Sequence, residues 1–262
     1  MSFYALRIIR LEIVVSYGRF GSAPTSAMVL PNTPHSVSKR LGLLAGIALA
    51  LSGSVVLGIV PLEAATPAPR VVDVPSKPAF IKPPQGGERP ARLGQIISYD
   101  SVLRTQKPGR MQVQLANGRS FRLGGDAVLR LGRHRLDLQR GQIIAWVNPG
   151  AKGGAPLTIH TRVATASIVG TTVFIEASDT GLKIFSWEGE VACTTTDGQR
   201  KILRSGEQLT YENGAWAKTR LTTQEAAARR QKSILLNGFS APMDTLPVLE
   251  KELGISTPVS AR

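Results

Sequence analysis

The stretch from Leu157 to Leu209 decides the fold. It begins LTIHTRVATASIVGTTVFIEA at Leu157, continues as LKIFSWEGEVACTT from Leu182, and ends as KILRSGEQL from Lys201 to Leu209. Apolar and polar residues alternate within these runs, and short polar turns that contain glycine separate them. Such alternation is typical of β-strands with one buried face. The stretch therefore predicts a compact antiparallel β unit.

Similar runs precede this stretch. Met111–Leu123 contains the dipeptide Asn117-Gly118, which suits a tight hairpin turn in which both central residues have positive φ. Val128–Leu131 and Arg135–Leu138 follow, each with two leucines on one face. Gln142–Val147 is apolar on both faces, which predicts a strand covered on both sides. Alternation places the apolar residues of this hairpin on one face and the polar residues on the other; the polar set is Gln112, Gln114, Ser120 and Arg122.

The C-terminal residues 222–262 predict a short helical extension. Thr222 and Glu225 have the spacing of a capping box, in which each side chain bonds the other's backbone N–H. A second helix is expected from about Leu246 to Leu253, with Pro247 in its first turn. These helices are expected to cover an open sheet edge or to dock on a partner. The predicted fold class is all-β: an antiparallel β-sandwich or β-roll over residues 92–221 with this extension.

The residues before the β unit resemble an export signal. Lys39 and Arg40 precede Leu41–Val60, which is uncharged, and small residues follow at Ala64 and Ala65. Residues 28–65 therefore predict a cleaved signal peptide or a single membrane anchor, with everything beyond Pro61 outside the cytoplasm. Residues 1–27 are interpreted as an upstream start, or as an amphipathic helix on the inner membrane surface. Residues 66–91, which are rich in proline, predict an extended linker.

Positive charge is concentrated in one part of the chain. The formal net charge is +14, and Arg89–Arg162 carries 13 Lys and Arg against 3 Asp and Glu. Such a field attracts anions. The hypothesis is a face for an anionic envelope polymer, and the alternative is a solvated basic rim. Nucleic acid is not expected, because aromatic residues are not interleaved with the basic ones. The candidate anion-binding residues are Arg122, Arg130, Arg133, Arg135 and Arg140.

Residues that could carry a reaction are sparse. His35, His134 and His160 lack metal-ligand spacing, so neither a metal site nor a cofactor is predicted. Glu188 and Glu190 lie two apart but are interpreted as solvated acids rather than a catalytic pair. The single cysteine, Cys193, lies in an alternating run and is expected to be a small buried apolar residue. The chain is therefore predicted to be no enzyme.

The β unit resembles the core of the FecR family of bacterial extracytoplasmic regulators. The resemblance covers about Gln95–Leu221, and Val169, Thr172 and Arg162 depart from the family pattern. Relatives of the iron-transport type carry a sigma-factor-binding segment before the membrane helix, and this chain is predicted to lack it. The corresponding motifs are Ile159–Ala166, Gly170–Phe174, Glu188–Val191 and Gly206–Leu209.

The resemblance implies an exported, non-enzymatic module that binds a ligand or acts as a scaffold in the envelope. The alternative is a single-pass sensor that signals to a transcription-regulating partner through a retained Leu41–Val60 helix. The expected location is periplasmic or secreted. Ligand, partner and oligomeric state stay open.

Overall fold

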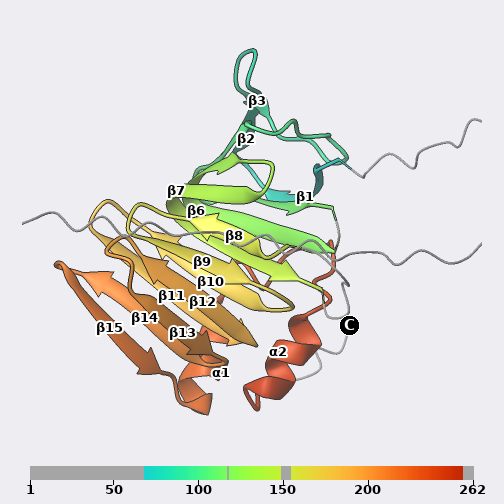
Figure 1. Ribbon diagram of the computed structural model, residues 1–262. Helices are drawn as coiled ribbons and strands as arrows, with labels where there is room; N and C mark the ends of the chain where they lie inside the picture. The colour runs from blue at the N-terminus through green and yellow to red at the C-terminus, as the bar shows by residue number, and fades with distance from the viewer. Residues whose placement is uncertain (1–67, 117, 149–154, 256–262) are drawn as a thin grey trace, which may run out of the picture. The chain divides into compact units, whose positions relative to one another are not determined.

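The computed structural model of the chain describes residues 68–116, 118–148 and 155–255, all within the compact unit Pro61–Arg262. Strands dominate it, and two helices follow at the C-terminal end (Figure 1). The strands are β1 Arg70–Ser76, β2 Ala79–Lys82, β3 Arg89–Pro90, β4 Val102–Thr105, β5 Arg110–Gln114, β6 Arg119–Leu131, β7 Arg135–Val147, β8 Leu157–His160, β9 Ala164–Ile168, β10 Thr172–Ala177, β11 Gly181–Glu188, β12 Glu190–Thr195, β13 Arg200–Arg204, β14 Glu207–Glu212 and β15 Ala215–Arg220. The helices are α1 Thr223–Lys232 and α2 Leu246–Glu252.

The long hairpin of β6 and β7 joins two layers. The first half of β6 pairs with β5, and its second half pairs with β4. Likewise the first half of β7 pairs with β8 and its second half with β10. One layer therefore holds β1, β5, β10, β11, β14 and β15, and the other holds β2, β3, β4, β8, β9, β12 and β13. The pairs are antiparallel except for β7 with β8, so the predicted all-β antiparallel class is confirmed.

The change of partners occurs at a bend in the hairpin. The β6–β7 register shifts between Gly124 and Val128, and Gly125, Asp126 and Gly141 all have positive φ. At Gly141 a Cβ atom would lie 2.3 Å from the Cα of Ala127, so only glycine allows the two strands to approach there. The bend lets a single sheet fold over its own apolar face.

The main core lies between the two layers. It contains Phe121 and Ile184 from one layer and Leu129, Ile159 and Val191 from the other, all at or near zero exposure. The leucines at 129, 131, 136 and 138 face this core, as their alternation predicts. Alternation along the strands therefore identified the core-facing residues correctly.

The C-terminal extension covers the outer face of one layer. Along β7, Ile143 and Ala145 belong to the main core, whereas Ile144 and Trp146 belong to a second apolar cluster with Leu235 and other residues of the extension. The prediction that this strand is covered on both sides is confirmed. The expected edge cover is wrong, because the extension packs on a sheet face. The second cluster consists of Ile144, Trp146, Phe185, Trp187, Leu235, Leu236, Met243 and Leu249.

Both predicted helices form. The Thr222–Glu225 capping box is present at α1. Thr245 precedes α2 without a side-chain capping bond, and Pro247 lies in its first turn. The lysine and arginines in the last turn of α1 favour the carbonyl end of the helix. Local sequence signals were sufficient to predict both elements.

The linker predicted for residues 66–91 is wrong for most of its length, since β1, β2 and β3 lie within it. Val71, Ala79 and Ile81 are buried in the main core. Pro75 is tolerated in β1 because, among the described strands, β1 pairs only with β5. The N–H that proline lacks is therefore not needed for hydrogen bonds to a second neighbouring strand. The β domain therefore begins near Arg70 rather than at residue 92. Ala164–Ile168, within the first of the quoted alternating runs, forms the separate strand β9.

No helix of residues 68–116, 118–148 or 155–255 is both long and apolar enough to cross a bilayer. The predictions for residues 1–27 and 28–65 lie outside the described residues.

Candidate functional site

Arg122 does not belong to an exposed basic face, and the prediction that it does is wrong. The residue is 2% exposed beneath the C-terminal extension. Its Nη1 and Nη2 atoms donate to the carbonyls of Leu235 and Ala241, each at 2.9 Å, and its Nε donates to Gln112 Oε1 at 2.8 Å. Burial lowers the pKa of Arg122 to about 10. Arg122 therefore holds the extension in place instead of facing an external anion.

The four other predicted arginines do not converge on one site. Arg130 pairs with Asp100 at 3.1 Å, and Arg135 pairs with Asp137 at 3.1 Å. Arg140 lines a separate cavity of about 560 Å³, and Asp126, Glu176 and Asp179 also line it. Surface ion pairs of this kind contribute little to stability and weaken the attraction for an outside anion.

Arg133 and Arg135 do share a hollow. Together with Arg119 and His134 they line a space of about 240 Å³ in which no described residue contributes a carboxylate. The Arg133 guanidinium lies 5.0 Å from the centre of the Tyr99 ring, and Arg119 donates to the Ala155 carbonyl. This hollow is the part of the predicted basic surface that the fold assembles.

Polar side chains of the sheet fix the extension, and the sequence analysis missed this role. Arg110 Nη1 donates to the carbonyls of Ile234 at 2.9 Å and Asn237 at 3.2 Å. Asp73 Oδ2 accepts from the backbone N–H of Ala241 at 3.0 Å. The Arg122 guanidinium stacks 4.2 Å from the centre of the Phe239 ring. The only signal in the sequence is the apolar run Ile234–Leu236 with Phe239 close behind, which needs a surface to pack on.

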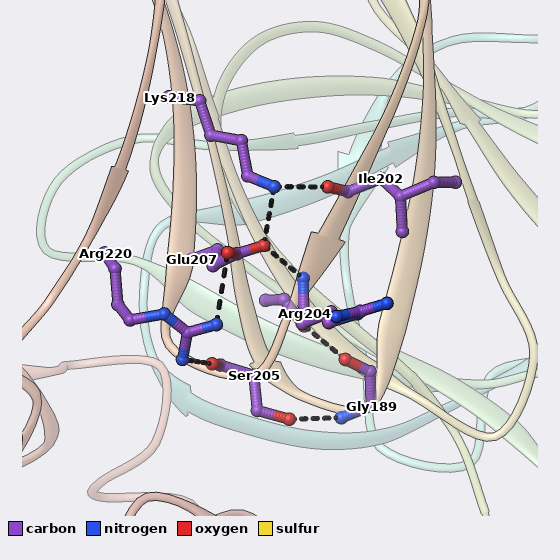
Figure 2. Close-up of polar contacts among 8 residues, drawn as sticks. Gly189, Ile202, Arg204, Ser205, Glu207, Lys218 and Arg220 are labelled. Carbon is purple, nitrogen blue, oxygen red and sulfur yellow. Dashed lines mark hydrogen bonds and ion pairs between the residues drawn. The ribbon is translucent and has the colours of Figure 1, made fainter.

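A charged corner joins three strands (Figure 2). Glu207 of β14 accepts from the backbone N–H of Arg204 at 2.8 Å and pairs with Lys218 at 2.8 Å and Arg220 at 3.1 Å. Lys218 also donates to the Ile202 carbonyl at 2.8 Å. Burial alone would raise the pKa of Glu207, but the Arg204 N–H and the two cations outweigh it and lower that pKa to about 2. We interpret the corner as structural, since the Glu207 carboxylate is bound by Lys218, Arg220 and the Arg204 N–H.

Glu188 and Glu190 do not act as a pair. Glu188 is 3% exposed and accepts from Thr172 Oγ1 at 2.9 Å, whereas Glu190 is exposed. Burial raises the pKa of Glu188, the Thr172 hydroxyl opposes that rise, and nearby Glu252 adds to it. The interpretation of both acids as solvated is therefore wrong for Glu188, which the corner after β11 turns into the interior.

Cys193 is fully buried, as predicted, and burial raises the pKa of its thiol to about 12. A thiol that stays protonated is a poor nucleophile and metal ligand. Within the described part of the chain, no three residues of His, Cys, Asp and Glu lie close enough to hold a metal ion.

Comparisons with known proteins match solved structures and one family model. Two crystal structures of a candidate anti-sigma factor from Parabacteroides distasonis ATCC 8503 are similar to this chain. The 1.65 Å structure is 21% identical over 47% of this chain and 61% of its own, with a TM-score of 0.40. The 2.50 Å structure is 20% identical over 50% of this chain and 64% of its own, with a TM-score of 0.43. The chain thus spans less than two thirds of either one.

A comparison with curated proteins finds no match. The family model described as "FecR protein" matches residues 101–192, which run from the start of β4 into β12 and include the β6–β7 hairpin. Over these residues the chain is similar to FecR proteins.

Proposed function

We propose that this protein is an exported, non-enzymatic FecR-domain module that binds a ligand or another protein in the cell envelope. The FecR match at residues 101–192 is the observation that carries the proposal. The signal-like pattern of residues 28–65 supports export. The separation of buried Glu188 from exposed Glu190 supports a binding role over glycoside chemistry, which needs two carboxyl groups across one substrate.

An alkaline phosphatase fusion tests export. The enzyme, which is active only outside the cytoplasm, is joined after Pro69 in one fusion and after Ser38 in a control. We expect activity from the first fusion alone, because only it contains the uncharged Leu41–Val60 run. An inactive Pro69 fusion that accumulates in the cytoplasm would contradict the proposal.

An anionic partner would use the hollow bounded by Arg119, Arg133 and Arg135. Arg suits bidentate contact with carboxylate or phosphate. The test is cosedimentation of the full-length protein with peptidoglycan sacculi and with anionic vesicles. We expect Arg133→Glu/Arg135→Glu to lower the bound fraction several-fold, and Arg200→Glu/Lys251→Glu, away from the hollow, to leave it unchanged. If the unmodified protein and both double variants bind equally, an anionic polymer is excluded as the partner at this hollow. A protein partner then remains as the candidate.

A membrane-anchored regulator is the second candidate. Its support is the length of Leu41–Val60, 20 uncharged residues, which equals the number that a helix needs to cross a bilayer. Determining the N-terminus of the protein from its own envelope separates the two candidates. A start at Ala65 or Thr66 indicates a cleaved signal and a free module. An intact stretch from Lys39 to Pro61 indicates an anchored protein.

A further inference from the structure

A cavity lies between the C-terminal extension and the outer face of the sheet. Its volume is about 430 Å³, which is within the range of small-molecule sites. One wall comes from β7, β10 and β11, and the other from the end of α1 and Ser233–Leu235. The cavity is separate from the arginine-lined hollow beside Tyr99, because the two share no lining residue.

The lining of this cavity has a positive balance. Lys183, Arg229 and Lys232 contribute cations, and Glu176 is the one acidic residue among the described lining residues. Both carboxylate oxygens of Glu176 are engaged: Oε1 accepts from Gln142 Nε2 at 2.7 Å, and Oε2 pairs with Lys183 Nζ at 3.3 Å. Among the described residues no carboxylate forms an ion pair with Arg229 or Lys232, although the negative charges of Glu176 and Glu225 act to raise the pKa of Arg229.

The rest of the lining is apolar and partly aromatic. Phe174 and Trp187 come from the sheet, and Ile234 and Leu235 come from the extension. The Trp187 ring is fixed edge-on against Phe185, with ring centres 4.8 Å apart. A flat apolar body suits such walls, because aromatic rings stack or meet edge-on at these separations.

Two unsatisfied donors belong to the same lining. In the described part of the chain, four buried side-chain nitrogen or oxygen atoms lack a hydrogen-bond partner, and two of them are Trp187 Nε1 and Arg229 Nη1. Trp187 is 1% exposed. Arg229 Nη2 already donates to Gln208 Oε1 at 2.7 Å, and burial lowers the pKa of Arg229. Native proteins rarely leave buried donors unpaired, so these two N–H groups are the donors that an acceptor in the cavity would meet.

We propose that this cavity binds a small carboxylate with an aromatic body. The carboxylate accepts hydrogen bonds from Arg229 and Trp187, with Lys232 adding charge, and the ring packs against Phe174 and Leu235. Charge-assisted bonds of this kind are the strong ones, and a low local dielectric strengthens them further. This inference does not rest on export or on any protein partner, so it can fail without the proposed function failing.

Such a ligand would also tie the extension to the domain. One wall of its site is the sheet and the other is the extension, so the ligand binds only when the two are docked. By mass action, binding then stabilises the docked state. A small molecule could in this way control whether the outer sheet face is covered.

The test is titration calorimetry on the full-length protein with 1-naphthoate and with its neutral analogue 1-naphthamide. We expect saturable binding of naphthoate and at least about tenfold weaker binding of naphthamide, which corresponds to one charge-assisted bond. Arg229→Gln and Lys232→Gln should weaken naphthoate binding. Arg200→Gln and Lys251→Gln are matched controls outside the cavity and should bind as the unmodified protein does.

Each alternative result overturns the proposal. Naphthoate that fails to bind at about 10 mM, or that binds no tighter than naphthamide, excludes a carboxylate site. Equal weakening by Lys232→Gln and Lys251→Gln shows a general charge effect instead of a site. If Arg229→Gln does not fold, as judged by circular dichroism, the lysine pair of variants still decides the question.

Discussion

At the residue scale, Arg122 is a buried charged side chain that fastens the C-terminal extension to the sheet. Its guanidinium satisfies two carbonyls of the extension and the Gln112 side chain, and it stacks on Phe239. A buried acceptor that loses its donor costs about 1–3 kcal/mol. Arg122 thus links a strand of the sheet to a segment more than a hundred residues later in the chain.

Replacing Arg122 with methionine should lower the free energy of unfolding by roughly 2–4 kcal/mol, because several acceptors lose their donor at once. Urea unfolding followed by circular dichroism measures the change. Arg130→Met is the matched control in the same strand; its exposed pair with Asp100 should cost less than about 1 kcal/mol. Equal losses in the two variants would show that Arg122 does not anchor the extension.

Glu207 gives a prediction about pH. Its pKa in the folded protein is about 2, below that of a free glutamate, so the unfolded chain binds more protons as the solution is acidified. The stabilisation is complete above the unfolded pKa and is lost as pH falls from about 4.5 towards 2. Because Lys218 and Arg220 are about half exposed, we expect only about 1–2 kcal/mol.

The measurement is urea unfolding at several pH values for Glu207→Gln and for Glu212→Gln, at the exposed end of the same strand. Glu207→Gln should flatten the loss of stability between about pH 5 and pH 2. Glu212→Gln should retain it. An unchanged slope in Glu207→Gln would mean that the charged corner contributes nothing to acid sensitivity.

At the element scale, the hairpin of β6 and β7 turns one sheet into two layers. Gly141 makes its bend possible, since a Cβ there would meet the Ala127 backbone. Gly198 is a useful comparison because its φ of 84° is close to the 87° of Gly141, yet it has no atom within 4 Å of a built Cβ. Alanine at Gly198 would be strained only by the positive φ, whereas alanine at Gly141 would also clash with the Ala127 backbone.

Gly141→Ala should therefore destabilise the protein by roughly 3 kcal/mol or more, because strain and backbone overlap add. Gly198→Ala should cost about 1–2 kcal/mol from strain alone. Thermal unfolding of the two variants measures the difference. A similar cost for both would show that the strands separate easily at the bend.

Much of this element level could be predicted from sequence. The alternation of Val113, Phe121 and Leu129 identified strands and their buried faces, and Thr222 and Glu225 identified the start of α1. Alternation reports one buried face, however, and cannot tell whether a later segment covers the other. For that reason Arg122 was assigned to solvent. The strands of residues 70–90 were missed because proline argues against a central strand but not against an edge strand.

The candidate sites were harder to predict than the fold. Arg133 and Arg135 are two residues apart and share a hollow, so local spacing was informative there. The cavity of Trp187 and Arg229 joins β11 to α1 across more than 40 residues, and nothing in the spacing of those residues marks it. Contacts made across the fold are set by how the layers pack, which no short motif encodes.

At the scale of the whole molecule, the described domain has two apolar clusters, one on each face of the same sheet layer. The main core lies between the sheet layers, and the second cluster lies between one layer and the extension. The sheet residues Ile144, Trp146, Phe185 and Trp187 are each 1% exposed or less in this arrangement. The extension is therefore an outer layer of the fold and not a loose tail.

A chain that ends at Leu221 tests this arrangement. Removing residues 222–262 uncovers two tryptophans, a phenylalanine and an isoleucine on one sheet face, and it leaves buried Arg122 without its carbonyl partners. Contiguous apolar patches larger than a few hundred Å² are rare on soluble proteins. We therefore expect several-fold higher binding of the dye ANS and concentration-dependent association in sedimentation velocity. A chain ending at Ile255 is the control, because it keeps both helices and the second cluster, and it should behave as the full protein does. If the shorter chain stays monomeric and binds no dye, the sheet face must close by itself, and the extension would be a separable partner-binding element.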